Sequence, residues 1–313
     1  MKKQAATTKP LVIVAYDAEW PRFFHEEAER IKAFMGETVA DLHHIGSTSV
    51  PGLSAKPIVD MLLVTRDLEE ARQHLTSSEL GYRYKGEYNL PLRDLYGKSG
   101  PCETYLHVHQ VGNPEIALNV LFRDFLRDHR DAREHYERAK LAASQSSGAG
   151  DKVEAGITQY NLRKNDSIVS ILRNTGFDSL CVRFVAQHRE HEAFEQFRSE
   201  FFEQIGGGDL TEVSAESKKF VLYQGTEIIG SAGLSDGGAG RASIDFAISE
   251  TPEGFLRLLQ VIEAWVMLRM QADSLSAVAL QEQSALYVSA GFVALQGARG
   301  SGKVPVWKRI LNA

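Results

Sequence analysis

Cysteine is scarce in this chain, and its scarcity excludes several classes of protein. Cys102 and Cys181 are the only cysteines in 313 residues, so neither a disulfide framework nor a cysteine-rich metal site is expected. Long apolar runs are also missing: none would cross a bilayer, and residues 1–10 are polar and basic without the apolar segment of a signal peptide. We expect a reduced, cytoplasmic protein with a disordered tail at residues 1–10.

Basic charge is not in excess either. The formal net charge is −6, which provides no general attraction to nucleic acid and favours a small-molecule or nucleotide-like substrate. No membrane partner is indicated, and the oligomeric state stays open. A hydrophobic fraction of 43% and a charged fraction of 24% are those of a globular protein, and the length predicts two domains.

The pattern of apolar residues predicts an α/β chain with domains at 11–176 and 179–313. In the first domain strands and helices alternate, and the nearly all-apolar segment Pro57–Thr65 predicts a strand buried on both faces of a sheet. A short strand is expected at Leu11–Ala15, a loop-rich stretch around residues 93–100, and a single closing helix at Ile157–Leu172. In the second domain the predicted order is strand, helix, three strands, helix, strand, helix and two final strands.

The motif HIGSTSVPGLSAKPIVD, which ends at Asp60, is the most informative segment of the first domain. Gly46 lets the backbone approach a ligand closely, and Ser47, Thr48 and Ser49 bring hydroxyl and amide donors to the same turn. Asp60 interrupts an apolar strand, where an ionised carboxylate is costly unless it is paired or bound to a metal. Donors for phosphate that face a carboxylate for its cation are the elements of a magnesium–nucleotide site.

On this motif the stretch from Val12 to Arg173 resembles the GrpB family. The segments YDAEWP from Tyr16, LHVH from Leu106 and LFRDFL from Leu121 add to the match. That family is grouped with the polymerase-β-like nucleotidyltransferases, so the resemblance implies their fold, with a Gly-Ser turn for phosphate and carboxylates for Mg²⁺. The residues that we expect to bind a nucleotide or phosphate are His44, Gly46, Ser47, Thr48, Ser49, Lys56, Arg93 and Lys164.

The sequence departs from that superfamily at the second acid. Active nucleotidyltransferases place two acids two residues apart on this strand, whereas here Leu62 follows Asp60 on the same face. His107 and His109 share a face of a later strand and are candidate substitutes, and imidazoles favour Zn²⁺ or Mn²⁺ over Mg²⁺. The candidate metal ligands are therefore Asp60, His107 and His109. A metal-free phosphate site and hydrogen-bonded structural histidines are the alternatives.

The second domain resembles the GNAT family of acyltransferases. The segment QSALYVSAGF from Gln283 is similar to that family's A-x-x-L-Y-x-x-x-G-F ending. The resemblance implies that Tyr287 protonates the leaving CoA thiolate, because a phenol with a pKa of about 10 is a suitable acid. It also implies that Asp245 contacts the substrate amine. The expected CoA-binding residues are Ala247, Ile248, Gly254, Arg257 and Tyr287.

The pyrophosphate loop of that family is altered in this chain. The usual Arg/Gln-x-x-Gly-x-Gly/Ala loop binds phosphates with amide donors and the helix dipole. Here the segment SETPEGFLRLL keeps one glycine, Gly254, loses a donor at Pro252 and adds the repelling charges of Glu250 and Glu253. Without the loop, the alternative for Tyr287 is a core aromatic residue.

Three functions follow from these observations, with Asp60, Tyr287 and Asp245 as the candidate catalytic residues. The first is a small-molecule transferase, most concretely an acetyl-CoA-dependent N-acetyltransferase whose first domain binds a nucleotide-like ligand. The second is nucleotidyl transfer by the first domain with a divalent metal, Mg²⁺, Mn²⁺ or Zn²⁺. The third is a non-catalytic ligand-binding or sensor protein in which both sites have lost their chemistry.

Overall fold

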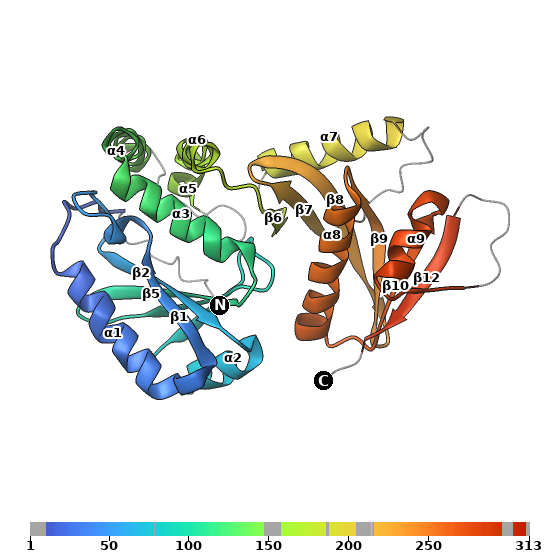
Figure 1. Ribbon diagram of the computed structural model, residues 1–313, viewed down its shortest axis with the longest axis horizontal. Coiled ribbons are helices and arrows are strands. Elements are labelled where there is room, and N and C mark those ends of the chain that lie inside the picture. The colour runs from blue at the N-terminus through green and yellow to red at the C-terminus, as the bar shows by residue number, and fades with distance from the viewer. Residues whose placement is uncertain are drawn as a thin grey trace, which may run out of the picture. The chain divides into compact units, whose positions relative to one another are not determined.

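The chain folds into two compact units, shown as ribbons in Figure 1. The first unit comprises Met1–Tyr88 and Arg93–Phe177, and the second comprises Asn89–Leu92 and Asp178–Ala313. Each unit has one mixed β-sheet with helices, which confirms the α/β class expected from the sequence.

The computed structural model describes most of the chain. The described residues are 11–77, 79–146, 158–185, 188–204, 214, 216–295 and 303–310. The tail expected at residues 1–10 lies outside this set.

The first unit is built on a five-stranded sheet in the order β1-β2-β5-β4-β3. Its central strands β2 and β5 run parallel, and the other neighbours run antiparallel. Asp60 on β2 lies opposite Ile45 on β1 and Tyr105 on β5, so the sheet places this carboxylate between two strands. The bounds are β1 Val39–Ile45, β2 Ile58–Thr65, β3 Arg83–Gly86, β4 Asp94–Lys98 and β5 Glu103–Gln110.

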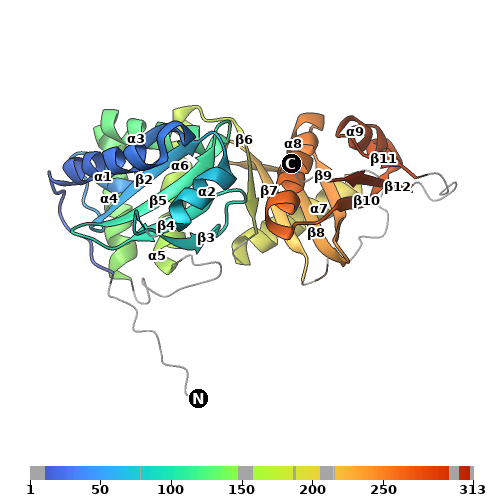
Figure 2. The same cartoon turned by 90° about the horizontal axis from the view of Figure 1, so that it is seen from below.

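Helices cover both faces of this sheet. α1 (Trp20–Met35) and α2 (Leu68–Thr76) pack on one face, and α2 stands in front of the strands in Figure 2. α3 (Pro114–Asp128) packs on the opposite face, where its apolar side chains meet those of β1 and β2. Beyond α3 lie α4 (Arg130–Gln145), α5 (Gln159–Arg163) and α6 (Asn165–Thr175).

The second unit is built on a seven-stranded sheet in the order β11-β12-β10-β9-β8-β7-β6. β9 and β10 are parallel neighbours, and the remaining pairs of neighbouring strands in this sheet are antiparallel. The bounds are β6 Leu180–Phe184, β7 Lys218–Gln224, β8 Glu227–Gly238, β9 Arg241–Ser249, β10 Ser274–Leu280, β11 Val293–Ala294 and β12 Lys303–Arg309. The helices are α7 His188–Gln204, α8 Pro252–Trp265 and α9 Ser284–Ser289.

A β-bulge at Asp245 divides the strand β9. Phe246 pairs with Gly233 and Ile244 pairs with Leu234, so Asp245 is an extra residue between them. Before and after the bulge, Ile244 and Ala247 both join the core under α8, whereas Phe246 packs against α7. The bulge therefore shifts the alternation of side chains along β9, so that the strand supplies apolar residues to the helices on both faces of the sheet.

Three local expectations from the sequence are corrected by tertiary pairing. The strand expected at Leu11–Ala15 is reduced to a single bridge between Val14 and Ala55. The loop expected around residues 93–100 contains β4, because β5 and β3 supply partners on both sides. The single closing helix becomes α5 and α6, which meet at Lys164.

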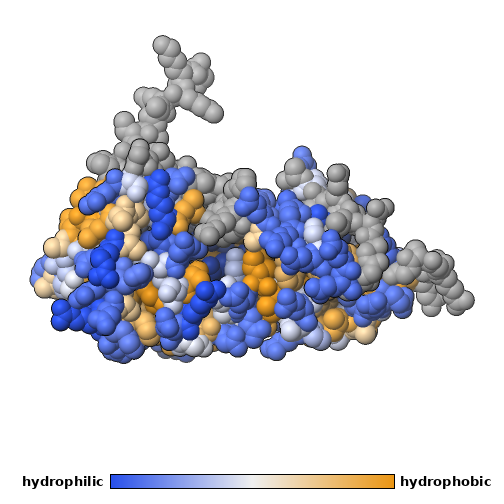
Figure 3. Space-filling view, turned by 90° about the horizontal axis from the view of Figure 1, so that it is seen from above, coloured by the Kyte–Doolittle hydropathy of each residue, from blue (hydrophilic) through white to orange (hydrophobic). Residues whose placement is uncertain are grey.

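Hydrophilic side chains predominate on the face drawn in Figure 3, with apolar ones gathered in limited patches. No helix in the described part of the chain is long and apolar enough to span a membrane.

Candidate functional site

The Gly-Ser turn lies against the carboxylate of Asp60. The turn forms a short 3₁₀ helix, Ser47–Ser49, and Gly46 precedes it with a φ of 68°. A Cβ atom at Gly46 would lie 2.5 Å from Asp60 Oδ2, so only glycine permits both this backbone conformation and this approach. The turn and the strand carboxylate, which the sequence predicts to face each other, are therefore in contact.

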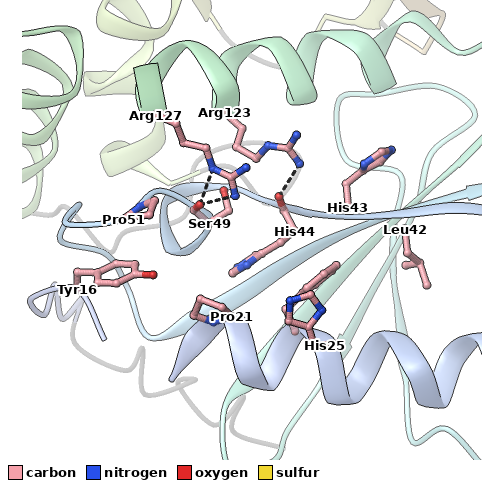
Figure 4. Close-up of a pocket in the computed structure, with 11 residues that line it drawn as sticks. Tyr16, Pro21, His25, Leu42, His43, His44, Ser49, Pro51, Arg123 and Arg127 are labelled. Carbon is pink, nitrogen blue, oxygen red and sulfur yellow. Dashed lines mark hydrogen bonds between the residues drawn. The ribbon is translucent and has the colours of Figure 1, made fainter. Parts of the chain in front are cut away.

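Two arginines of α3 hold the carbonyl groups of this segment, as Figure 4 shows. Arg127 donates Nε and Nη2 to the Ser49 carbonyl at 3.0 and 2.7 Å, and Arg123 donates Nη1 to the His44 carbonyl at 3.1 Å. His44 Nε2 lies 3.0 Å from the Thr48 hydroxyl, and burial lowers the pKa of His44 to about 4. His44 is therefore a neutral partner of Thr48 at pH 7 and a fixed part of the turn.

Three lysines gather near Asp60 and the turn. Lys56 and Lys164 place their Nζ atoms 4.4 and 4.9 Å from the centre of the Tyr160 ring. Lys140, from α4, is 1% exposed, lies 5.3 Å from the Tyr136 ring and donates to the Ser54 carbonyl at 2.5 Å. We call Lys56, Lys140 and Lys164 the lysine cluster.

The lysine cluster has too little negative charge for its size. In the described part of the chain, two acidic groups raise the pKa of these lysines by their charge. Asp60 affects all three lysines, and Glu137 affects Lys140. Burial lowers the pKa of Lys140 to about 7 and that of Lys56 to about 8, and it also lowers the pKa of Lys164. Perturbed lysines beside one carboxylate are a typical feature of ligand sites.

Tyrosine hydroxyls complete this part of the site. Tyr136 shares a hydrogen bond with the Ser47 side chain, and burial raises its pKa far above the ordinary value. Burial likewise raises the pKa of Tyr160, and the charge of Asp60 acts in the same direction. Both phenols are neutral donors at pH 7, next to the three ammonium groups.

The candidate metal ligands do not form a metal-binding group. His107 Nε2 lies 3.5 Å from Asp60 Oδ1, but the His109 ring is fully enclosed and has no hydrogen-bond partner on either nitrogen among the described residues. Burial lowers the pKa of His109 well below its ordinary value. Across the described ranges no three His, Cys, Asp or Glu side chains are placed to hold a metal ion.

The expected phosphate-binding residues are divided between different surroundings. Gly46, Ser47, Lys56 and Lys164 meet beside Asp60. Arg93 is buried, and its charge lowers the pKa of His109. It donates Nη2 to the Glu87 carbonyl at 2.9 Å.

Lys140 and Tyr136 were not among the residues predicted from the sequence. They lie on a helix far along the chain from the turn, and their three-to-four-residue spacing resembles an ordinary buried helix face. A lysine within that face is the signal that was available.

In the second unit, Tyr287 is a core residue. It is 1% exposed and makes edge contacts with Phe255 and Phe292, with ring centres 5.2 Å away in each case. Burial raises its pKa far above the ordinary value, so it is a poor proton donor to a ligand in solvent. This geometry favours the packing alternative over the expected catalytic role.

A pocket of about 220 Å³ lies where α8 begins. It is lined by the ends of β9 and β10 and by Pro252, Phe255 and Leu286. Glu250, one of the two acids expected from the altered loop, lines it together with Glu282, whereas Glu253 is not among its lining residues.

The other expected CoA residues have local structural roles. Gly254 donates its amide to the Thr251 hydroxyl at 3.1 Å as part of a helix cap, and a Cβ there would lie 2.5 Å from Ser249 Oγ. Arg257 is not among the residues that line this pocket, and burial lowers its pKa. The side chains of Ala247 and Ile248 are buried in the two cores.

Asp245 retains an unsatisfied oxygen at the bulge. Its Oδ1 accepts a hydrogen bond from the Ser235 hydroxyl at 2.6 Å. Its Oδ2 is buried and has no hydrogen-bond partner among the described residues. A buried carboxylate oxygen of this kind favours a proton-donating ligand such as an amine.

The fold and the site thus define a two-unit α/β protein whose first unit places cations, hydroxyls and one carboxylate around a Gly-Ser turn. The GrpB protein family model matches residues 10–174, and the chain belongs to the GrpB family.

The UPF0157 protein YqkA of Bacillus subtilis (strain 168) is 36% identical over 146 residues, which are 45% of this chain and 43% of YqkA. The chain therefore spans less than half the length of that relative. The UPF0157 protein BH1888 of Halalkalibacterium halodurans is 36% identical over 141 residues, which cover 43% of this chain and 70% of that protein.

Two solved structures are each similar to about half of the chain. The conserved protein GrpB from Enterococcus faecalis covers 51% of this chain and 98% of its own, with 28% identity and a TM-score of 0.43. A putative N-acetyltransferase from Lactobacillus plantarum covers 43% of this chain and 100% of its own, with 17% identity and a TM-score of 0.38.

Proposed function

We propose that the GrpB-family unit binds a small molecule with a phosphate group or another multivalent anion at the lysine cluster. The observation that carries this proposal is the convergence of three lysines, of which Lys140 is buried, on the carboxylate of Asp60, with Glu137 as a further acid near Lys140. An enclosed cation without a full counter-charge is costly, so the site gains free energy when an anion enters.

The surrounding groups suit a phosphoryl ligand. The Nζ atoms of Lys56 and Lys164 both lie close to the Tyr160 ring, so one anion bound there can contact both. Tyr136 and Ser47 add hydroxyl donors. Phosphate oxygens accept several such bonds, and each charged donor strengthens them. Binding of the anion would raise the pKa of the lysines, because it favours their protonated forms.

The same site gives little support to metal-dependent nucleotidyl transfer. Leu62, at the position of the second acid, is fully buried with Ile45 and Val64 against α3. Asp60 and His107 provide only two potential metal ligands that face each other. The positive charge of the lysine cluster repels a divalent cation. Binding, rather than a chemical step through a metal, is therefore the function that these residues support.

The test measures binding of inorganic phosphate and of ATP to the full chain by isothermal titration calorimetry without added metal. We expect at least one ligand to bind, and Lys56→Met and Lys164→Met each to weaken binding by about tenfold, the effect of one lost charged hydrogen bond. Lys32→Met, on the exposed face of α1, is the matched control and should leave affinity unchanged. Equal affinities for all three variants would overturn the proposal.

A second candidate function, acyl transfer from acetyl-CoA to an amine, is favoured by the separation of β9 and β10. Their parallel pairing runs from Arg241 and Ser274 only to Ile244 and Ala277, although both strands continue. Backbone groups beyond that point face an opening that an extended amide-containing ligand can bridge. The unsatisfied oxygen of Asp245, in the same strand, suits the accepting amine.

The test of this second function is release of free CoA from acetyl-CoA in the presence of a panel of primary amines. If Asp245 positions the amine, Asp245→Asn should reduce the rate by about tenfold or more, whereas Tyr287→Phe should retain most of it. A rate that depends on Tyr287 but not on Asp245 would contradict this assignment. Because Glu250 and Glu282 repel phosphates, Glu250→Gln should lower the KM for acetyl-CoA.

A further inference from the structure

A separate pocket lies beside the Gly-Ser turn. Its volume is about 290 Å³, and the lysines of the cluster are not among the residues that line it. Residues from three places form its walls: the N-terminal segment and α1, the strand β1, and the helix α3. Figure 4 shows Tyr16, His25 and Arg127 around the space next to His44 and Ser49.

One part of this pocket is apolar and the other is cationic. Tyr16, Phe24 and Leu42 contribute aromatic and aliphatic surface, and Phe24 is stacked on the neutral ring of His44. Arg123 and Arg127 contribute two guanidinium groups. A concave site with apolar walls and a few polar groups at one end is the usual form of a small-molecule site.

The cationic part is lined by two guanidinium groups and, among the described residues, by no carboxylate. Asp124 accepts hydrogen bonds from Arg123 Nε and Nη2 at 2.7 and 3.0 Å and lies 3.5 Å from Arg127 Nη1. Arg127 donates through Nε and Nη2 to the Ser49 carbonyl, a neutral group. Both guanidinium groups contact the carboxylate of Asp124, and the charge of Asp128 also acts on Arg127.

The histidines that line this pocket supply no negative charge. His43 Nε2 already lies 3.2 Å from Asp41 Oδ2. The electrostatic effect of His25 lowers the pKa of His44, as a nearby positive charge does. Burial and the charge of Arg123 lower the pKa of Arg127, and Asp124 and Asp128 offset this only in part.

We propose that this pocket binds a small monoanion with an apolar body, an aryl or alkyl carboxylate. A carboxylate matches the planar donors of arginine, and its negative charge suits a pocket end that is lined by two arginines and by no acid from the described part of the chain. The apolar end then covers the hydrocarbon part of the ligand. This site is distinct from the phosphate site, because it is lined by the arginines of α3 and by none of the lysine cluster.

The test titrates benzoate, with benzamide as its neutral isostere, into the full chain and follows binding by saturation-transfer NMR. We expect benzoate to bind at least about tenfold more tightly than benzamide, because the charge is what the arginines recognise. Arg127→Met should lower benzoate affinity by a similar factor. Since Arg127 also supports the turn, Leu42→Trp, which fills the pocket without changing charge, should abolish binding independently.

Two further variants separate binding in this pocket from binding at the lysine cluster or at exposed cations. Arg130→Met, whose side chain is 80% exposed on α4, should leave benzoate affinity unchanged. Lys56→Met should also leave it unchanged, whether or not the lysine cluster binds phosphate. Loss of benzoate binding in Lys56→Met with retention in Leu42→Trp would overturn the proposal, and so would equal affinity for benzoate and benzamide.

Discussion

The two units use the same kind of scaffold and surround it with opposite charge. In the first, the carboxylate of Asp60 lies against a glycine turn and is surrounded by lysines and tyrosines. In the second, Asp245 lies at a bulge, and the pocket at the start of α8 is lined by Glu250 and Glu282. A mixed sheet with helices on both faces therefore does not select the ligand; the residues at its irregular points do.

The two units also differ in how they use glycine. At Gly46 the backbone has a positive φ and a carboxylate occupies the space of a side chain, so conformation and contact both require glycine. At Gly254 the requirement is contact alone, because the residue lies in the first turn of α8 against Ser249. The first arrangement shapes a site, and the second packs a helix on its sheet.

The largest expected effect tests the first arrangement. Gly46→Ala should lower the free energy of unfolding by about 3 kcal/mol, because it adds a left-handed backbone penalty and a clash with Asp60 Oδ2. Gly52→Ala is the matched control: its φ is 79°, but nothing lies within 4 Å of the added Cβ. That variant should lose only about 1 kcal/mol. Equal losses in urea denaturation would show that contact with Asp60 contributes nothing.

A second prediction concerns the pH dependence of phosphate binding by the first unit. Phosphate affinity of the first unit should fall as pH rises from 7 to 9, by up to about tenfold per pH unit, because Lys140 and Lys56 lose their protons with pKa values of about 7 and 8. Calorimetry at several pH values measures this fall. Affinity that is constant over this range would contradict the assignment of those lysines to the site.

The same shifts predict the pH dependence of stability in the absence of ligand. Because the pKa of Lys140 is about 7 when folded and 10.5 ordinarily, the unfolded chain binds more protons between these values. The free energy of unfolding of the first unit should therefore rise with pH across this window. Chemical denaturation at pH 7 and 9 measures the change, and Lys140→Met should remove most of the increase.

The smallest expected effect compares two buried tyrosines. Tyr136→Phe removes the hydroxyl that bonds Ser47 and should weaken phosphate binding about three- to tenfold, the effect of one hydrogen bond. Tyr287→Phe changes a residue that packs between Phe255 and Phe292 and should leave the affinity for phosphate unchanged. Calorimetry on both variants measures the difference, and similar losses would point to a general effect on folding.

The local features of the candidate site could be predicted from the sequence. The glycine turn, the interruption of an apolar strand by Asp60 and the apolar residue at Leu62 all depend on neighbours within a few positions. The acids at the start of α8 are equally local. Lys140 was not predicted, because its bond to the Ser54 carbonyl joins residues 86 positions apart.

Local sequence was sufficient to establish the α/β class, the order of strands and helices in the second half, and the residues of the turn beside Asp60. Such features follow from periodicity and turn chemistry, which act over short distances along the chain. Long-range packing was needed to bring three lysines to that turn, to enclose Tyr287 among aromatic rings, and to form the bulge at Asp245. These outcomes depend on how separate helices and strands pack, and the packing brings together side chains that no local pattern connects.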